Sequence, residues 1–270
     1  MTLLEVDSLS ITTTDGTRLV DSASFRVERG EALGIVGESG SGKSLSCRAV
    51  LGIVPDALTV NAAGIHFDGT DLMHATPSTW RGIRGTRIGA VFQDPGAYLN
   101  PSIPVGRQLA EVHRVKRGLS RHDAQDATIH GFGDLGLVDP ERVVTRLPRE
   151  LSGGMLQRVM IAIAIAESPD LLIADEPTTA LDATVQAEVL DVLDDLRTTR
   201  GVAILFVSHD LPVVAQVCDQ ILVMQHGRIV EQGTAAQVLH DPEHTYTRTL
   251  LADHAEYGLD RFLVTEAAHA

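Results

Sequence analysis

The segment GESGSGKS at residues 37–44 constrains the fold of this chain more than any other stretch. It follows the apolar run ALGIVG at 32–37, and it leads into KSLSCRAVLGIV, which has a helical pattern. Glycine at positions 37, 40 and 42 lets the backbone curl so that its N–H groups point inward. A strand, a curled loop and a helix in this order predict an α/β unit that binds a phosphate at the helix N-terminus.

Lysine is rare in this chain: of the 22 Lys and Arg residues, only Lys43 and Lys116 are lysines. A compact ammonium fits inside a ring of backbone amides, whereas a guanidinium fork does not. We expect Lys43 to reach the β- and γ-phosphates of a nucleotide and the Ser44 hydroxyl to ligate Mg²⁺. A glycine turn with a capping serine is the structural alternative. The other loop residues predicted to contact the nucleotide are Gly37, Glu38, Ser39, Gly40, Ser41 and Gly42.

The apolar runs of the chain predict a parallel sheet. Apolar and polar residues hardly alternate in three of these runs, as expected for strands buried on both faces. The runs are LLIAD at 171–175, AILFVSH at 203–209 and ILVM at 221–224. Helical patterns such as Ala183–Arg197 lie between them, whereas the first 30 residues alternate more and favour antiparallel strands. The predicted fold is therefore α/β. It comprises a core with a parallel sheet that resembles the P-loop (RecA-like) fold, an N-terminal antiparallel β subdomain and an inserted α-helical subdomain.

The middle of the chain differs from its two ends. From about Pro95 to Pro148 no strand-like run occurs, whereas Val105–Arg117 and His122–Leu135 have helical patterns. We therefore expect a single domain over residues 1–270. Its nucleotide-binding core is predicted in 1–93 and 165–270, and its helical subdomain, with the motif LSGGMLQR, in 94–164.

Composition weighs against several other classes of protein. The formal net charge of −14 repels nucleic acid and no basic run offsets it, so no nucleic-acid partner is expected. MTLLEVDSLS does not resemble a signal peptide, and the longest apolar run, Val159–Ala166, is too short to span a membrane. Cys47 and Cys218 lack a metal-ligand spacing and are expected to be buried, reduced thiols. His240 and His244 have no third ligand nearby, which favours surface histidines over a metal site.

Two adjacent acids follow the apolar strand in LLIADEP at 171–177. Asp175 at the strand end is expected to hold Mg²⁺ through its water shell, opposite Ser44. Glu176 is expected to orient and deprotonate an attacking water. Two further strand-end residues are candidates: Gln93 as a buried amide near Mg²⁺ or the water, and His209 as a hydrogen-bond donor to the γ-phosphate. Each signal is weak alone, but together with the phosphate loop they predict nucleotide hydrolysis.

LSGGMLQR at 151–158 indicates a second anion site. Ser152, Gly153 and Gly154 precede the helical pattern MLQRVMIAIAIAE, so they mark a helix N-terminus with exposed N–H groups. We expect this site on the helical subdomain, away from the phosphate loop. One chain then holds two half-sites for a nucleotide. The simplest use of both is a dimer, in which Ser152–Gly154 of one subunit closes over the nucleotide that the other subunit's loop holds.

These motifs closely resemble, in order and over nearly the whole chain, those of the ATP-binding subunits of ABC transporters. The matching segments are GESGSGKS, Gln93, LSGGMLQR, LLIADE, TALD at 179–182 and His209. The resemblance implies ATP and Mg²⁺ as cofactors and ATP hydrolysis that drives transport. It further implies that Gln93 links the γ-phosphate to a membrane partner, that Ser152–Gly154 act on the other subunit's ATP, and that Asp182 communicates across the dimer.

Further segments resemble the dipeptide, oligopeptide and nickel importers: FQDPGAYLNP, SGGMLQRVMIA, ADEPTTALD, GRIVEQG at 227–233 and HTYTRTLLA at 244–252. The absence of a cysteine-containing tail favours the short, nickel-type members. The resemblance implies a second ABC ATPase subunit, identical or paralogous, two integral membrane permeases and an extracytoplasmic solute-binding protein. It implies a location at the cytoplasmic face of the cell membrane. The adenine-stacking aromatic of the family has no counterpart in TTTDGTRLV at 12–20, so stacking is not expected.

Two other functions share the ATP motifs. One is a soluble ABC-type ATPase that acts on a non-transport scaffold, such as iron–sulfur assembly, and the stretches VFQDPGAYLNP and GRIVEQG favour a transporter over it. The other is a DNA-repair ATPase. The net charge of −14 and the lack of a long coiled-coil insertion weigh against this second alternative.

Overall fold

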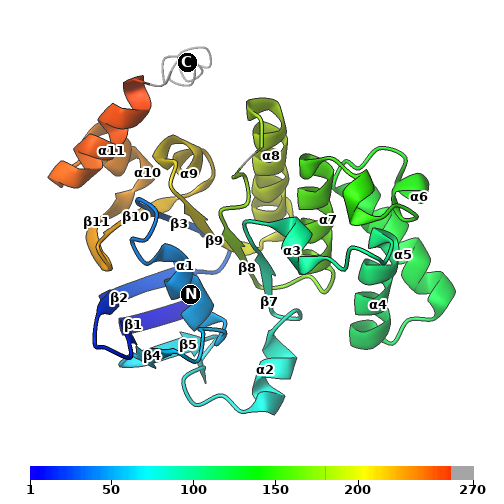
Figure 1. Ribbon diagram of the computed structural model, residues 1–270, viewed down its shortest axis with the longest axis horizontal. Coiled ribbons are helices and arrows are strands. Elements are labelled where there is room, and N and C mark those ends of the chain that lie inside the picture. The colour runs from blue at the N-terminus through cyan, green and yellow to red at the C-terminus, as the bar shows by residue number, and fades with distance from the viewer. Residues whose placement is uncertain (180, 257–270) are drawn as a thin grey trace. The chain divides into compact units, whose positions relative to one another are not determined.

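The computed structural model describes residues 1–179 and 181–256, and Figure 1 labels most of its helices and strands. Packing divides the chain into two compact units. The first contains Met1–His74 and the described residues from Leu205 onward, and the second contains Ala75–Ile204. The predicted phosphate loop lies in the first unit, whereas LSGGMLQR and LLIADE lie in the second. Each unit therefore carries part of the predicted nucleotide machinery.

An antiparallel sheet forms the N-terminal part of the first unit, in the strand order β2-β1-β5-β6, with β4 also paired to β1. Alternate residues of β2, such as Ala23, Phe25 and Val27, are buried, because a period of two places them on one face. The antiparallel N-terminal strands that the sequence predicts are thus confirmed. The strands are β1 (Thr2–Thr13), β2 (Arg18–Glu28), β4 (Leu58–Asn61), β5 (Gly64–Phe67) and β6 (Thr70–Asp71).

A second sheet positions the phosphate loop. Its strand order within the first unit is β11-β10-β3-β9. Strand β3 runs parallel to β10, with Leu33 opposite Gln220, and β11 returns antiparallel to β10. Every residue of β3 is buried, as expected of a strand covered on both faces. These strands are β3 (Ala32–Val36), β9 (Ala203–Ser208), β10 (Gln220–Gln225) and β11 (Arg228–Thr234), and the helices of this unit are α1 (Lys43–Val50), α9 (Leu211–Val217), α10 (Ala235–His240) and α11 (Thr245–Glu256).

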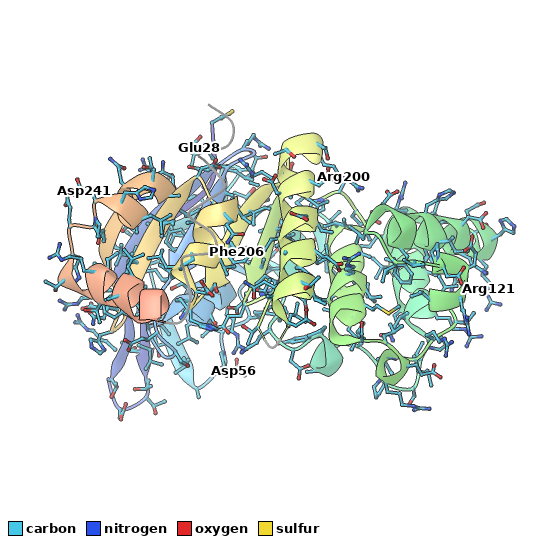
Figure 2. The ribbon with its side chains drawn as sticks, turned by 90° about the horizontal axis from the view of Figure 1, so that it is seen from above. Glu28, Asp56, Arg121, Arg200, Phe206 and Asp241 are labelled. Carbon is cyan, nitrogen blue, oxygen red and sulfur yellow. The ribbon has the colours of Figure 1, made fainter. Side chains whose placement is uncertain are left out.

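The second unit contains two parallel strands that precede its predicted site residues. Strand β7 (Ile88–Val91) pairs with β8 (Leu171–Asp175), so that Ile88 lies opposite Leu171. The first two residues of β9 also belong to this unit, and the Ala203 N–H donates a hydrogen bond to the Asp170 carbonyl at 3.0 Å. Further along β9, in the first unit, Phe206 is completely buried, and its side chain is labelled in Figure 2.

Helix α7 is the central helix of the second unit. It contacts α3, α4, α5 and α8 as well as β7, and Figure 1 shows it beside α4 and α5. Contacts on so many sides explain its almost continuous apolar sequence, because both Val159 and Ile161 are completely buried. The helices of this unit are α2 (Pro77–Ile83), α3 (Pro95–Tyr98), α4 (Val105–Arg117), α5 (Arg121–Asp134), α6 (Pro140–Val143), a 3₁₀ turn (Pro148–Glu150), α7 (Gly153–Ile165) and α8 (Ala183–Arg200).

Sequence-based bounds and observed bounds agree closely for the long elements. Helix α4 has the predicted bounds, because Pro104 precedes it and Gly118 ends it in the left-handed conformation. Residues 94–164, all of them described, form only helices and connecting loops. The mixed α/β fold with an antiparallel N-terminal sheet and a parallel sheet is confirmed, whereas the bounds of the functional subdomains stay a prediction. Within the described ranges, no helix is both long and apolar enough to cross a membrane.

Candidate nucleotide-binding and hydrolysis site

Residues 37–42 form a curled loop between β3 and α1. Gly37, Gly40 and Gly42 have φ angles of 152°, 83° and 104°, values that residues with a side chain rarely adopt. The Ser41 N–H donates to the Glu38 carbonyl at 3.2 Å, which closes the first half of the loop. Helix α1 then begins at Lys43, so its N-terminal N–H groups follow the loop directly.

Two of the three glycines are also required by close packing. A Cβ atom on Gly37 would lie 2.1 Å from the backbone oxygen of Met224, and one on Gly42 would lie 2.9 Å from that of Leu19. A Cβ on Gly40 would meet no atom within 4 Å. Gly37 and Gly42 are therefore needed for both conformation and space, whereas Gly40 is needed for conformation alone.

The Lys43 ammonium lies within the loop. Lys43 is 4% exposed, and its Nζ donates to the carbonyl oxygens of Gly37 at 2.6 Å and Glu38 at 2.8 Å. Among the described residues, no side chain caps α1 by a hydrogen bond, and its first turn carries no acid. A buried ammonium beside an uncapped helix N-terminus is a site with positive potential and N–H donors, which suits a phosphate anion.

His209 follows β9 in the same unit as the phosphate loop. Its side chain is exposed, and the next residue, Asp210, caps α9 by accepting a hydrogen bond from the Val213 N–H at 3.1 Å. The Asp210 N–H in turn donates to the Ser208 hydroxyl at 3.0 Å. His209 therefore sits at a strand end whose backbone is fixed on both sides, and its contact with a γ-phosphate stays a prediction.

Asp175 and Glu176 occupy the end of β8 in the second unit. Asp175 is 4% exposed, whereas Glu176 is half-buried. Glu176 has a φ of 50°, an uncommon value for a residue with a side chain, and such strain is often found at functional sites. Its carboxylate accepts a hydrogen bond from the Thr179 hydroxyl at 2.8 Å. Thr179 is the first residue of the TALD motif, but no local pattern in the sequence predicts this contact.

Gln93 differs from the sequence-based expectation, because its side chain is exposed and not buried. Strand β7 already ends at Val91, and the chain then turns into the short helix α3. Asp94 caps this helix by accepting a hydrogen bond from the Gly96 N–H at 3.0 Å. The turn carries the Gln93 amide away from the strand and into solvent.

The signature segment caps helix α7. The Ser152 hydroxyl accepts a hydrogen bond from the Met155 N–H at 3.3 Å, and both Ser152 and Gly153 are exposed. Gly154 is buried, and a Cβ atom there would lie 2.2 Å from Cγ1 of Val185 on α8. Close packing of two helices therefore requires the second glycine, while the first leaves the helix N-terminus open to solvent.

Asp182 caps the neighbouring helix α8. Its carboxylate accepts hydrogen bonds from the N–H groups of Thr184 at 3.1 Å and Val185 at 3.0 Å. Since Val185 also packs against Gly154, the signature segment and Asp182 are adjacent within the second unit. Ala180, the second residue of TALD, lies outside the described residues. Communication across a dimer by Asp182 stays a prediction.

The remaining candidates behave as structural residues. Cys47 and Cys218 are buried and form no disulfide. His240 ends α10, and Nδ1 of His244 accepts a hydrogen bond from the Tyr246 N–H at 3.2 Å. Among the residues that the structure describes, no three His, Cys, Asp or Glu side chains are grouped so as to hold a metal ion.

The comparison of sequences identifies relatives over almost the whole chain. Residues 20–179 match the model of the ABC transporter family. The chain is 43% identical over 253 residues to the metal-staphylopine import system ATP-binding protein CntD of Staphylococcus aureus, which covers 93% of each protein. It is 42% identical over 264 residues to the dipeptide transport ATP-binding protein DppD of Escherichia coli, which covers 97% of this chain and 81% of DppD.

Solved structures share the fold. The chain superimposes with a TM-score of 0.78 on cbiO1 from Clostridium perfringens, part of the ABC transporter complex cbiONQ, with 26% identity and 96% of each chain covered. The TM-score is 0.76 with the ATP-binding cassette MJ0796 bound to ADP and Pi, with 24% identity over 86% of this chain and 99% of that one. The family match and these relatives show that the chain belongs to the ABC transporter family as one of its ATP-binding subunits, which hydrolyse ATP to drive transport.

Proposed function

We propose that this chain is the ATPase of an import system for a peptide or a metal chelate. The observation that carries the proposal is the curled loop 37–42, which encloses the buried ammonium of Lys43. The solute class rests on the relatives, because one is a metal-staphylopine import protein and another a dipeptide transport protein.

Each unit contributes residues to the proposed ATP chemistry. In the first, the loop N–H groups, Lys43 and His209 bind the phosphates, and hydrogen bonds from these donors stabilise the charge that develops during hydrolysis. In the second, Glu176 accepts a proton from the attacking water. Oxygen donors suit Mg²⁺, and both the Ser44 hydroxyl and the buried Asp175 carboxylate supply them. When bound, Mg²⁺ neutralises charge on the phosphates.

A second ATPase subunit, either a copy of this chain or a paralogue, completes the proposed site. Ser152 and Gly153 are exposed at the N-terminus of α7, so their N–H groups are accessible to a nucleotide held by another subunit. ATP binding then draws two subunits together, and hydrolysis releases them. The closed pair with ATP bound and the open pair after hydrolysis differ in the contacts between the subunits. The movement between these two states performs the mechanical work.

The partner permeases are proposed to dock beside Gln93. Phe92 and Tyr98 stack with ring centroids 4.7 Å apart, and Tyr98 is 52% exposed. Ile103, just before α4, is 38% exposed. Exposed aromatic and aliphatic side chains next to a polar loop are typical of protein interfaces. Docking there puts this chain at the cytoplasmic face of the membrane, together with two permeases and an extracytoplasmic solute-binding protein.

The soluble scaffold ATPase and the DNA-repair ATPase receive no comparable support. Both named relatives are ATP-binding proteins of import or transport systems, and each aligns with at least 93% of this chain. The net charge of −14 also disfavours binding to duplex DNA. Co-purification with integral membrane permeases after detergent extraction distinguishes the transporter from both alternatives.

Two matched pairs of variants test the proposed chemistry. Glu176→Gln should keep ATP binding and lower kcat by about a hundredfold or more, whereas Glu141→Gln, the same change at an exposed position of helix α6, should leave kcat unchanged. Lys43→Ala should abolish ATP binding, and Lys116→Ala, at the only other lysine, should preserve it. Full activity of Glu176→Gln would contradict the assignment of the base, and unchanged ATP affinity of Lys43→Ala would contradict the loop assignment.

A further inference from the structure

The motif HTYTRTLLA contributes a residue that contacts the phosphate loop. Tyr246, in helix α11, is 7% exposed, and its hydroxyl accepts a hydrogen bond from the backbone N–H of Glu38 at 2.9 Å. The two residues are 208 positions apart in the sequence and belong to the same compact unit. This contact is not part of the ATP motifs, and it links the last described helix to the loop that holds Lys43.

The start of α11 is fixed by a single carboxylate on β11. Glu231 accepts hydrogen bonds from the N–H groups of Glu243 at 2.7 Å and His244 at 3.1 Å, and from the hydroxyl of Thr247. Burial alone would raise the pKa of Glu231, but these hydrogen bonds hold the pKa of this carboxyl below its usual value. Glu231 therefore stays ionised at neutral pH. The two backbone hydrogen bonds fix the chain just before Tyr246, so its ring has little freedom to leave the loop.

The Gly37–Glu38 peptide unit links this helix to Lys43. Its N–H donates to the Tyr246 hydroxyl, and its carbonyl, that of Gly37, accepts a hydrogen bond from Lys43 Nζ at 2.6 Å. The next carbonyl, that of Glu38, accepts from Lys43 Nζ at 2.8 Å and from the Ser41 N–H at 3.2 Å. The orientation of the Gly37–Glu38 peptide plane thus helps to determine where the ammonium is held. Burial raises the pKa of the Tyr246 phenol, so the hydroxyl remains neutral throughout the physiological range.

We propose that Tyr246 is a positioning residue for ATP binding, through which α11 fixes the conformation of the phosphate loop. The hydroxyl holds the Gly37–Glu38 peptide so that the following N–H groups and the Lys43 ammonium are oriented before ATP arrives. Preorganisation of this kind reduces the conformational freedom that binding would otherwise remove. The inference rests on the proposed role of residues 37–44 in binding the triphosphate.

The test compares two neighbouring hydroxyl deletions in the full chain. Tyr246→Phe retains the ring and removes only the acceptor of the Glu38 N–H, whereas Thr247→Val removes a hydroxyl that contacts Glu231 and spares the loop. We expect Tyr246→Phe to raise the Kd and KM for ATP by about three- to tenfold while kcat stays within about twofold. Thr247→Val should leave both constants within about twofold, although it removes a buried hydroxyl contact.

Amide hydrogen exchange gives a readout that a purely structural role does not move. The Glu38 amide should be protected in the wild type and should exchange faster in Tyr246→Phe, with amides elsewhere in the first unit unaffected. An unprotected Glu38 amide in the wild type would overturn the inference, even if the variant failed to fold. Equal ATP affinity of Tyr246→Phe and the wild type, or equal losses in both variants, would also overturn it. A wild type that does not bind ATP would refute the proposed function instead.

Discussion

The two loop glycines that differ in packing provide a quantitative test of the structure. Gly37→Ala and Gly40→Ala both place a side chain at a positive φ, of 152° and 83°, at a cost of about 1–2 kcal/mol each. Both also reduce the entropy of the unfolded chain, which returns about 0.4–1 kcal/mol. Conformation alone therefore predicts similar and small losses of about 1 kcal/mol for the two variants.

Packing separates the two variants. The new Cβ at position 37 would lie 2.1 Å from the Met224 oxygen, whereas ordinary contact begins at 3.4 Å, so about 1.3 Å of overlap must be relieved. Met224 is 1% exposed and belongs to β10, which pairs with β3 on one side and β11 on the other. Its carbonyl cannot move without disturbing the sheet, and this should add about 3 kcal/mol to the cost at Gly37.

Thermal unfolding in the absence of nucleotide measures this difference. For a chain of this size, 1 kcal/mol corresponds to about 2–4 °C, so the Tm of Gly37→Ala should lie about 6–12 °C below that of Gly40→Ala. The difference in Tm between the wild type and Gly40→Ala measures the small conformational cost at position 40. Equal Tm values for the two variants would refute the argument that the Met224 carbonyl dictates the need for glycine at 37.

Three further predictions concern other contacts. Thr179→Val should lower kcat about two- to fivefold with KM unchanged, because the hydroxyl orients the Glu176 carboxylate, and an unaltered kcat in steady-state ATPase assays would contradict this. Glu231→Gln should lower the Tm at pH 7. The pKa of Glu231 in the folded protein lies below its usual value of about 4.5, so the ionised carboxylate stabilises the fold above that pH and loses this effect in acid. The difference in Tm between the variant and the wild type should therefore shrink in acid, and a constant difference would contradict this prediction. Arg158→Lys should destabilise the second unit by about 2 kcal/mol, because the guanidinium donates to the carbonyls of Leu135 at 3.1 Å and Gly136 at 2.9 Å, and urea unfolding checks it.

Local sequence patterns predict the elements that are buried on all sides or have clear ends. Strand β8 (Leu171–Asp175) has its predicted bounds because five consecutive residues are buried, which leaves a continuous apolar run in the sequence. Helix α8 begins at the predicted Ala183, where Asp182 caps it, and it ends before Gly201 with a φ of 67°. The predicted end, Arg197, falls three residues short, because the exposed last turn carries no apolar residue.

Short or half-exposed elements have weaker local signals. Strand β11 (Arg228–Thr234) is mostly partly exposed and lies at an edge of its sheet, so its residues RIVEQGT show no clear period. The position of Gln93 is a similar case, because Gln93 follows an apolar run in the sequence. Whether the chain continues as a strand or turns into α3 depends on the Asp94 cap and on Pro95. The turn into α3 exposes the Gln93 amide.

Contacts that shape the phosphate loop cannot be found in the loop sequence. The glycines of GESGSGKS permit the curled conformation, but residues after position 205 select it. Met224 packs its carbonyl against Gly37, the Gly227 N–H donates to the Ser41 carbonyl at 3.0 Å, and Tyr246 accepts from the Glu38 N–H. An isolated loop of this sequence would sample many other conformations, because glycine has more backbone freedom than any other residue. The last part of the described chain therefore limits the loop to one conformation, and this restriction should add to the affinity for a triphosphate that Lys43 provides.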